Sequence, residues 1–510
     1  MSSTAERLID MLRADITALG HQGGIVTPSI YDTAQLLRYA PPEEPGAVVD
    51  WLLTQQRADG GWGPEVLPLA RHVPTLAAVL ALLTSSDAPR SRDAVDRGLA
   101  FLRENAEVWA FEGPLPDDIP VAVELVLPRL LDDAAAMGLS LPQQPFRALR
   151  AMGDKRRALI ARIKARAGTP PVHAWETWGT QAEPELLDGS NGLGNSPAAT
   201  AFWLHKHRLA HPEGTEWSRG AEQFLRAASV ATGVGVRGVV PTVWPIPRFE
   251  QPWGLLALMT TGLLMHPALQ DVIRPQMEDL HRALKPEGLG MSDDFMVDGD
   301  TTSTVVALLA SAGREMDGRL LERYQREGLF ITYSHELQPS LTTTAHGVLA
   351  LAVLGKDTSQ SLRFLLEKRG DNGVWVGDKW HCSWLYATSQ VMNALAQAGA
   401  AAELRAAAEA LVALRREDGG WGVGATSTAS ETAFAVHALF GLRAAPGASG
   451  ALVRRALRDA ARYLESLDHS PQRADRYWIG KELYGPVRVD RAFVLSARLA
   501  LELERDVLSR

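Results

Sequence analysis

The chain has 510 residues, of which 46% are hydrophobic and 22% are charged. These fractions are typical of globular proteins and exclude intrinsically disordered and fibrous classes, and the length allows roughly two to four domains. Lys and Arg number 52 against 60 Asp and Glu, giving a net charge of −8 without a long basic block. We therefore expect no nucleic-acid partner. The single cysteine, Cys382, cannot form an intramolecular disulfide, which favours a reducing compartment.

Residues 1–20 carry Arg and Asp at regular intervals, which predicts an amphipathic helix and not a signal peptide with an apolar centre. The longest apolar stretches, at 76–84 and 255–265, are shorter than the ~18 residues that suggest a membrane span. We expect a cytoplasmic protein with no stable membrane insertion.

Apolar residues recur at helical spacing in nearly every segment, and alternating strand patterns are scarce, which predicts an all-α fold. A short turn returns between helices: RADGGWG at 57–63, RGDNGVW at 369–375 and REDGGWG at 416–422. Such an internal repeat is typical of stacked or toroidal helix pairs. In each turn Gly supplies positive φ and Trp covers the next helix, so the tryptophans are predicted to be packing residues. They are Trp62, Trp375 and Trp421.

Two stretches rich in Gly and Pro, at 20–30 and 231–252, predict domain boundaries. The segment 164–197 contains few apolar residues and predicts long connecting structure inside the first domain.

The segment MSDDFMVDGDTTSTVVALLASAG at 291–313 places four carboxylates before an apolar helix. Helix capping is one explanation, because Asp, Ser and Thr are preferred at helix N-termini. Capping explains one Asp better than it explains Asp298 beside Asp300. A magnesium site is a second explanation, since DDFMVD has the DDxxxD form of some ionising terpene synthases. The second metal-binding motif of those enzymes is not evident in the sequence.

Brønsted acid chemistry is a third explanation. An Asp in an apolar cavity, with a second carboxylate two residues away, is disfavoured in its ionised form by desolvation and by like charge. Such an acid can protonate an alkene, which is very weakly basic and whose cation survives only where water is excluded.

VDGDTTS at 297–303 resembles the DxDD motif of class II terpene cyclases in its DxDTT variant, and the repeated turns resemble their QW-type repeats. Further segments resemble the same family in the same order along most of the chain. They are PSIYDTAQLL at 28–37, DDIPVAVELVLPRLLDDA at 117–134, HAWE at 173–176, NSPAATAF at 195–202, VPTVWPIPRFEQPW at 240–253, DKWHCSWLYATS at 378–389 and WIGKELY at 478–484.

The resemblance implies two α-helical (α/α) barrel domains in a βγ arrangement, with the active site between them. The β domain would comprise residues 1–25 and 235–510 and carry DxDTT, and residues 26–234 would form an inserted γ domain. The DxDTT variant resembles that of the bacterial enzymes that form drimenyl diphosphate. This implies an enzyme that protonates and cyclises farnesyl diphosphate to drimenyl diphosphate with the diphosphate retained.

Several alternatives stay open. A labdane-type cyclase acting on geranylgeranyl diphosphate has the same fold, as does a squalene cyclase, which is disfavoured because those chains are longer and carry an apolar membrane patch. A non-catalytic or prenyltransferase-like helical barrel protein is the alternative from another class. The prenyltransferase would need a zinc site of Asp, Cys and His, and Asp378, His381 and Cys382 resemble such a site only weakly.

Carried over residue by residue, the resemblance makes Asp300 the general acid and Asp298 its hydrogen-bonding support. Thr301 stands where most members have a third Asp, and the hydroxyls of Thr301 and Thr302 are expected either to orient Asp300 or to cap the helix. His346 is expected either to hold the water that takes the final proton or to be a satisfied buried histidine.

The substrate and metal ligands follow from the same resemblance. Basic residues that would neutralise the diphosphate are Lys481, Lys379 and Arg248. Mg²⁺ is the expected cofactor, and its ligands would lie in a degenerate acidic segment at Glu112, Asp117 and Asp118. Aromatic faces stabilise a carbocation, and the predicted rings are Trp380, Trp384, Tyr386, Phe330 and Tyr333.

Overall fold

The structure is a computed structural model, and it describes residues 2–86, 88–334, 336, 340–467 and 475–509. Most of these residues lie in helices, and the strands are short. The α-helices are α1 Ser3–Ala18, α2 Ile30–Tyr39, α3 Pro45–Thr54, α4 His72–Ser85, α5 Pro89–Glu104, α6 Val123–Ala136, α7 Arg147–Ile160, α8 Pro197–Ala210, α9 Glu216–Val230, α10 Pro247–Thr260, α11 Gln270–Ala283, α12 Gly299–Ser311, α13 Arg319–Glu322, α14 Leu341–Val353, α15 Ser359–Glu367, α16 Trp384–Gln397, α17 Ala401–Ala413, α18 Ala429–Leu439, α19 Gly447–Ser466, α20 Val487–Leu503 and α21 Arg505–Ser509.

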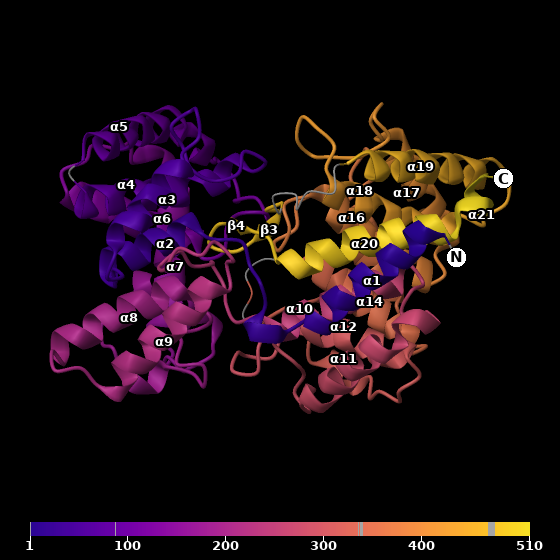
Figure 1. Cartoon of the computed structure of the whole chain (residues 1–510), viewed down its shortest axis with the longest axis horizontal. Helices are drawn as coiled ribbons and strands as arrows, with labels where there is room; N and C mark the ends of the chain where they lie inside the picture. The colour runs from indigo at the N-terminus through magenta and orange to yellow at the C-terminus, as the bar shows by residue number, and fades with distance from the viewer. Residues whose placement is uncertain (1, 87, 335, 337–339, 468–474, 510) are drawn as a thin grey trace.

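Two antiparallel hairpins accompany the helices. In one, β1 (Gln325–Arg326) pairs with β2 (Leu329–Phe330), and in the other β3 (Trp478–Ile479) pairs with β4 (Leu483–Tyr484). Figure 1 shows two lobes, one built from α2 to α9 and the other from α1 and α10 to α21, with the β3–β4 hairpin between them.

Six helices of the second lobe form a closed ring, in which α10, α12, α14, α16, α18 and α20 each pack against the next and α20 returns to α10. The ring helix α14 is buried along Leu341–Leu351, and its sequence contains no Asp, Glu, Lys or Arg. The outer helix α17 buries a single stripe, Leu404, Ala407, Ala408 and Leu411. The lobe is therefore an α/α barrel of inner and outer helices.

The first lobe has a smaller ring. Helix α4 packs against α2 and α6, α2 packs against α8, and the 3-10 segment η5 (Pro170–Thr177) closes the ring by contacting α6 and α8. The predicted all-α fold with two α/α barrels is confirmed. Helix α1 packs against α20 and α11 of the second lobe.

The repeated turns have one local geometry. The indole nitrogens of Trp62, Trp375 and Trp421 donate to the carbonyl oxygen ten residues earlier, at 2.8, 2.6 and 2.9 Å. All three side chains are fully buried. The predicted packing role of these tryptophans is confirmed, because each ring fixes the preceding helix to its turn.

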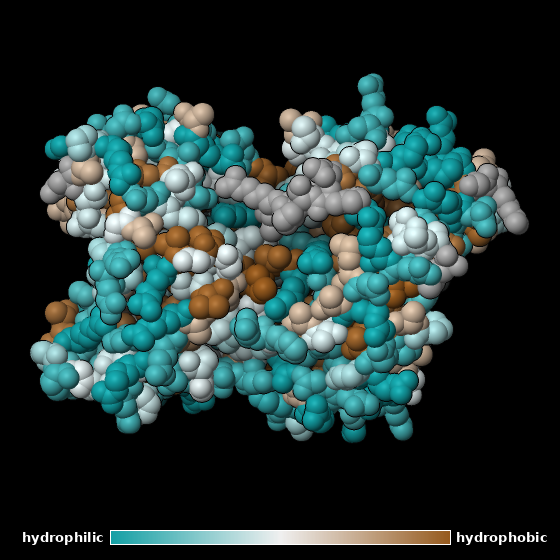
Figure 2. Space-filling view, viewed as in Figure 1, coloured by the Kyte–Doolittle hydropathy of each residue, from teal (hydrophilic) through white to brown (hydrophobic). Residues whose placement is uncertain are grey.

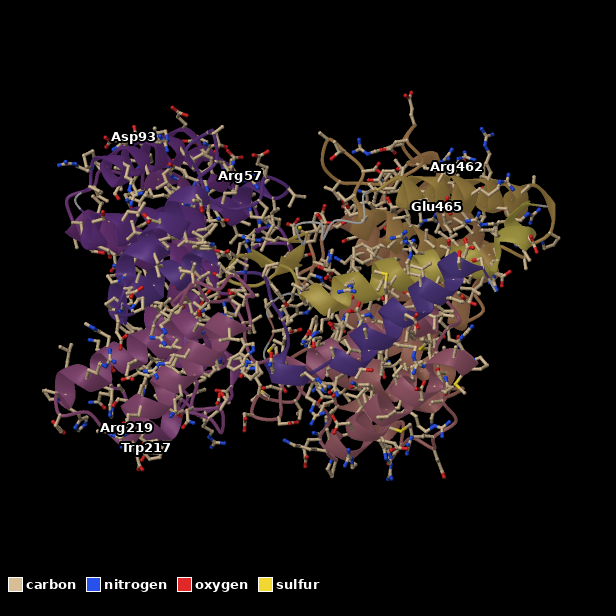
Figure 3. All side chains as sticks on the ribbon, in the orientation of Figure 1. Arg57, Asp93, Trp217, Arg219, Arg462 and Glu465 are labelled. Atoms are coloured by element: carbon tan, nitrogen blue, oxygen red, sulfur yellow. The ribbon has the colours of Figure 1, made fainter. Side chains whose placement is uncertain are left out.

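Charged side chains cover the outer surfaces, as Asp93 of α5 and Arg462 of α19 show in Figure 3. Hydrophobic residues on the face in Figure 2 gather near the junction of the lobes. Among the described residues, no helix has both the length and the apolar composition needed to cross a membrane.

Candidate active site

A cavity between the two lobes receives side chains from both. The first lobe contributes Val121, Ala122, Pro170, His173 and Ala174. The second lobe contributes Asp298, Asp300, Thr301 and most of the aromatic wall. The rings of that wall are Phe249, Trp253, Phe295, Tyr333, Trp380, Tyr386, Trp478 and Tyr484.

The DxDTT motif forms the start of α12. Asp298 is the N-cap residue, and its carboxylate accepts from the backbone N–H of Thr301 at 2.7 Å and from the Thr301 hydroxyl at 2.9 Å. Capping therefore explains Asp298, while Asp300, in the first turn, lines the cavity. Burial raises the pKa of Asp298 to about 8 against these hydrogen bonds, and the neighbouring Asp300 adds to the rise.

Asp300 is held by a histidine from the next ring helix. Nδ1 of His346 on α14 lies 2.6 Å from Asp300 Oδ1, and Nε2 lies 3.1 Å from Gln390 Oε1. His346 is 1% exposed. Burial alone would lower the pKa of His346, but the Asp300 carboxylate and the hydrogen bonds to Asp300 and Gln390 raise it. The interaction favours an imidazolium that donates to Asp300.

These contacts correct the expected role of Asp298 and decide between the two alternatives for His346, which is a buried histidine with partners at both nitrogens. The side-chain partner of Asp300 is His346, whereas both carboxylate oxygens of Asp298 accept from Thr301, so Asp298 is not the hydrogen-bonding support that was expected. His346 has protein partners at both ring nitrogens, so it has no free nitrogen to hold a water molecule.

The two threonine hydroxyls bond elsewhere. Thr301 Oγ1 donates to Asp298, and Thr302 Oγ1 both accepts from the N–H of Leu289 and donates to its carbonyl oxygen. Thr301 belongs to the helix cap, and Thr302 ties the preceding segment to α12. Neither hydroxyl orients Asp300 in the described contacts.

The aromatic prediction is correct for some rings and wrong for others. Trp380, Tyr386 and Tyr333 line the cavity. Phe330, with no exposed surface, lies in the core between α12 and α14, and Trp384 packs against the core of the second lobe. Packing alone explains these two rings.

Sequence reasoning missed Trp253 and Trp478. The Trp253 indole donates to the Tyr386 hydroxyl at 2.8 Å and meets the His346 ring edge-on at 5.6 Å. Its presence in VPTVWPIPRFEQPW, a segment quoted for the family resemblance, was the available signal. Trp253 thus connects the acid to the aromatic wall.

Lys481 is not placed to bind diphosphate. Its side chain has no exposed surface, and Nζ lies 2.6 Å from both Glu176 Oε1 and Ser196 Oγ. Asp32 Oδ1 is 3.9 Å away. The lysine of the hairpin is therefore already paired with a carboxylate of the first lobe.

Lys379 and Arg248 are also paired. Lys379 Nζ donates to Glu336 at 2.7 Å, and Arg248 donates to Asp293 at 2.8 and 3.0 Å and also to Asp279. Neither side chain lines the cavity. Their predicted contact with diphosphate is corrected, because carboxylates from other segments already neutralise them.

The proposed metal ligands do not form a closed site. Glu112 is exposed, and Asp117 and Asp118 are half-buried in the loop before α6. Within the described ranges, no group of three or more His, Cys, Asp or Glu side chains is placed to hold a metal ion. A resident magnesium ion bound by protein groups alone does not fit this segment.

The zinc-site alternative fails on the same grounds. The Asp378 carboxylate accepts from Ser340, Thr342 and the N–H of Trp380. Burial raises the pKa of the Cys382 thiol well above its usual value, which disfavours the thiolate that zinc requires.

His173 is a further cavity residue that the sequence did not single out. Its Nδ1 lies 2.8 Å from the carbonyl oxygen of Gly194, which can only accept, so Nδ1 carries the hydrogen. Burial, and then nearby Lys481, lower the pKa of His173 to about 3. The ring is therefore neutral at pH 7 and keeps a lone pair on Nε2.

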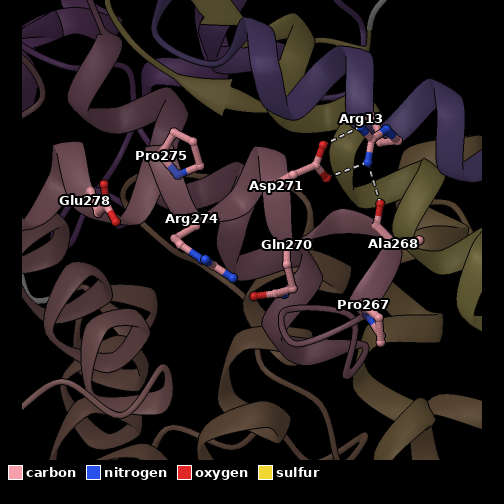
Figure 4. A pocket seen from close by; sticks show the side chains of 8 residues that line it. All are labelled: Arg13, Pro267, Ala268, Gln270, Asp271, Arg274, Pro275 and Glu278. Carbon is pink, nitrogen blue, oxygen red and sulfur yellow. Dashed lines mark hydrogen bonds and ion pairs between the residues drawn. The ribbon is translucent and has the colours of Figure 1, made fainter.

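A second hollow lies on the outside of the second lobe, between α1 and α11 (Figure 4). Two arginines, Arg13 and Arg274, line it, and Arg13 donates to both oxygens of Asp271 and to the carbonyl oxygen of Ala268. Arg13 and Asp271 are thus paired with each other, and the hollow is separate from the cavity that contains Asp300.

Two α/α barrels that enclose an aromatic cavity, with a carboxylic acid buried in its wall, define a cyclase that starts its reaction by protonation. Residues 338–486 match the squalene-hopene cyclase C-terminal domain family. The chain is 44% identical to (+)-kolavenyl diphosphate synthase from Herpetosiphon aurantiacus, over 99% of both chains. It is 31% identical to labda-7,13-dienyl diphosphate synthase from Streptomyces clavuligerus, over 95% of this chain and 91% of that protein.

A solved structure agrees with these relatives. The ent-copalyl diphosphate synthase from Streptomyces platensis is 30% identical and matches with a TM-score of 0.77, covering 98% of this chain and 99% of that one. The chain therefore belongs to the class II terpene cyclases.

Proposed function

We propose that this cyclase converts geranylgeranyl diphosphate into a bicyclic diphosphate and leaves the diphosphate bond intact. The position of Asp300 carries the proposal, because its carboxyl is held by buried His346 at the wall of an aromatic cavity. Kolavenyl, labdadienyl and copalyl diphosphates, for which the relatives are named, are all twenty-carbon compounds. They support the geranylgeranyl alternative over the farnesyl substrate and drimenyl product expected from DxDTT.

Asp300 would donate the first proton to the terminal double bond. Because Oδ1 accepts from His346, Oδ2 would carry the proton that is transferred. The hydrogen bond from His346 would stabilise the carboxylate that is left after the transfer. Asp298, with a pKa of about 8, is mostly neutral at pH 7 and adds little opposing charge.

The aromatic wall would then guide the cation. Each ring face attracts a cation by about 0.5 to 2 kcal/mol, more when water is absent. Trp253, Tyr386, Trp380 and Trp478 surround the same cavity as Asp300, so the attraction is available along the folded chain and not at one point. The shape of the cavity would guide the ring closures, since a folded substrate conformation places each double bond near the next developing cation.

His173 would accept the final proton. It lines the cavity from the opposite lobe to Asp300, and its neutral ring holds a free lone pair on Nε2. Its pKa of about 3 makes it a weak base, which is sufficient for a carbocation, a very strong acid. The assignment replaces the one made from the sequence for His346.

Magnesium is proposed to arrive with the substrate. Mg²⁺ commonly binds through one or two carboxylates and substrate phosphates and keeps several waters, so it needs no cage of protein ligands. Asp117 and Asp118 are the carboxylates we propose for this contact.

Product analysis tests the proposed function. Wild type and Asp300→Asn would be incubated with geranylgeranyl or farnesyl diphosphate and magnesium, treated with phosphatase, and analysed by mass spectrometry. We expect a bicyclic twenty-carbon alcohol from wild type and none from the variant, because Asn keeps the size of Asp and removes the acid.

Three other outcomes would contradict parts of this proposal. Equal product from Asp300→Asn would refute the acid assignment. A bicyclic product from farnesyl diphosphate alone would restore the drimenyl reading. Inorganic diphosphate released by wild type would indicate ionising chemistry.

A further inference from the structure

The β3–β4 hairpin extends from the second lobe into the first. The Glu482 carboxylate accepts from the N–H groups of Ile30 and Tyr31 at 2.9 and 2.8 Å, which caps helix α2. The N–H of Val121 donates to the carbonyl oxygen of Gly480 at 2.8 Å. These hydrogen bonds thus fix the hairpin to the backbone of the first lobe at the lobe junction.

The Lys481 side chain is the charged centre of this junction. Besides Glu176 and Ser196, each at 2.6 Å, Nζ lies 5.4 Å from the centre of the Tyr31 ring. The Tyr31 hydroxyl donates to the same Glu176 oxygen at 2.9 Å. All four side chains are almost fully buried, so water cannot replace these contacts without an opening of the junction.

The two partners adjoin two parts of the cavity wall, one from the hairpin and one from the first lobe. Ile479 and Gly480, immediately before Lys481, line the cavity from the hairpin. His173 and Ala174, shortly before Glu176 in η5, line it from the first lobe. Lys481 and Glu176 themselves do not line it. The ion pair therefore joins two walls from outside the cavity.

We propose that the Lys481–Glu176 ion pair sets the separation of these two walls and thereby determines which prenyl chain length the enzyme prefers. Charge-assisted hydrogen bonds are short and directional, so they fix the distance between the two wall segments more tightly than apolar contacts do. A displacement of a cavity wall by one bond length is of the size that decides whether an added isoprene unit is well placed. The inference rests on the proposed function, and both residues are positioning residues.

Two variants change the pair in different ways. Glu176→Asp keeps the charge and withdraws it by one carbon–carbon bond. The double variant Lys481→Met/Glu176→Met removes both charges, so neither partner is left buried and unpaired, and it gives the readout if the single variant does not fold. Asp133→Glu is the matched control, a one-carbon change in the Arg38–Asp133 ion pair of the first lobe, away from the cavity lining.

The readout is the ratio of kcat/KM for geranylgeranyl and farnesyl diphosphates, measured with the product profile and the melting temperature. We expect either pair variant to change this ratio by at least about tenfold, while Asp133→Glu keeps it. Folded pair variants whose ratio and product profile match those of wild type would overturn the inference while leaving the proposed function standing. A wild type that cyclises neither substrate would overturn the proposed function and, with it, this inference.

Discussion

The hydrogen bond from His346 to Asp300 predicts how strongly the protein stabilises the carboxylate that remains after proton transfer. His346→Phe keeps a ring in the space beside Trp253 and removes the Nδ1–H that reaches Asp300 Oδ1 over 2.6 Å. A hydrogen bond to a charged group contributes about 1.5 to 3 kcal/mol, and 1.36 kcal/mol is a factor of ten in rate. We expect kcat to fall roughly 10- to 150-fold.

The pH dependence separates this effect from a general loss of structure. Because Asp300 and Gln390 raise the pKa of His346, the imidazolium is present below that pKa and disappears as pH rises through it. We expect wild-type kcat to fall as pH increases through this range, and the fall to be absent from the variant. Initial rates of bicyclic product formation, measured between about pH 6 and 9 for both enzymes, show whether kcat falls in this way.

A matched control is available in the same lobe. His437 is 1% exposed, and its ring contacts Thr260 and the carbonyl oxygen of Phe493, away from the cavity. His437→Phe should lower the melting temperature and keep kcat per folded molecule. A His346→Phe enzyme with wild-type kcat and an unchanged pH profile would refute the role given to the hydrogen bond between His346 and Asp300.

Asp298→Asn should become more stable relative to wild type as pH rises from 5 to about 8. Between pH 3.8 and about 8 the Asp298 carboxyl is protonated in the folded protein and ionised in the unfolded chain. The stability of wild type therefore falls as pH rises through this window, and melting temperatures measured against pH would show it. Trp421→Phe should cost about 1 to 3 kcal/mol of unfolding free energy, because the Leu411 carbonyl loses its donor; unchanged denaturant unfolding would contradict this. Arg248→Met should keep the wild-type KM, since Arg248 is already paired, and a raised KM would restore its contact with diphosphate. A chelator should stop turnover and leave the melting temperature of the free protein unaltered; a lower melting temperature would reveal a resident ion.

Features encoded in short segments were predictable from the sequence. The turns carrying Trp62 and Trp421 follow a local rule, because each indole reaches the carbonyl ten residues earlier. The acid, Asp300, was also predictable as a candidate, since capping needs only one carboxylate and Asp298 fills that role. Local geometry was sufficient in both cases.

Charge pairing was not predictable, because the partners are remote in sequence. Lys481 and Glu176 are separated by 305 positions, and nothing near either residue indicates the other. A lysine in a motif can face an anionic substrate or a buried carboxylate, and only the packing of the two lobes decides. The same holds for aromatic rings: Phe330 and Tyr333 are three residues apart, yet one packs in the core and the other lines the cavity.

The packing of α1 on α20 has a consequence for how the chain reaches this fold. Leu8 and Leu12 share one core with Leu495 and Leu499, and the Ser2 hydroxyl donates to Glu502 at 2.5 Å. During synthesis α1 can pack in its final place only after α20 has been made. The lobe from α2 to α9 can form earlier, because domains generally fold as units. The two ends lie together, so a circular permutant that links them and opens the chain near residue 234 would turn a nested order into two consecutive barrels.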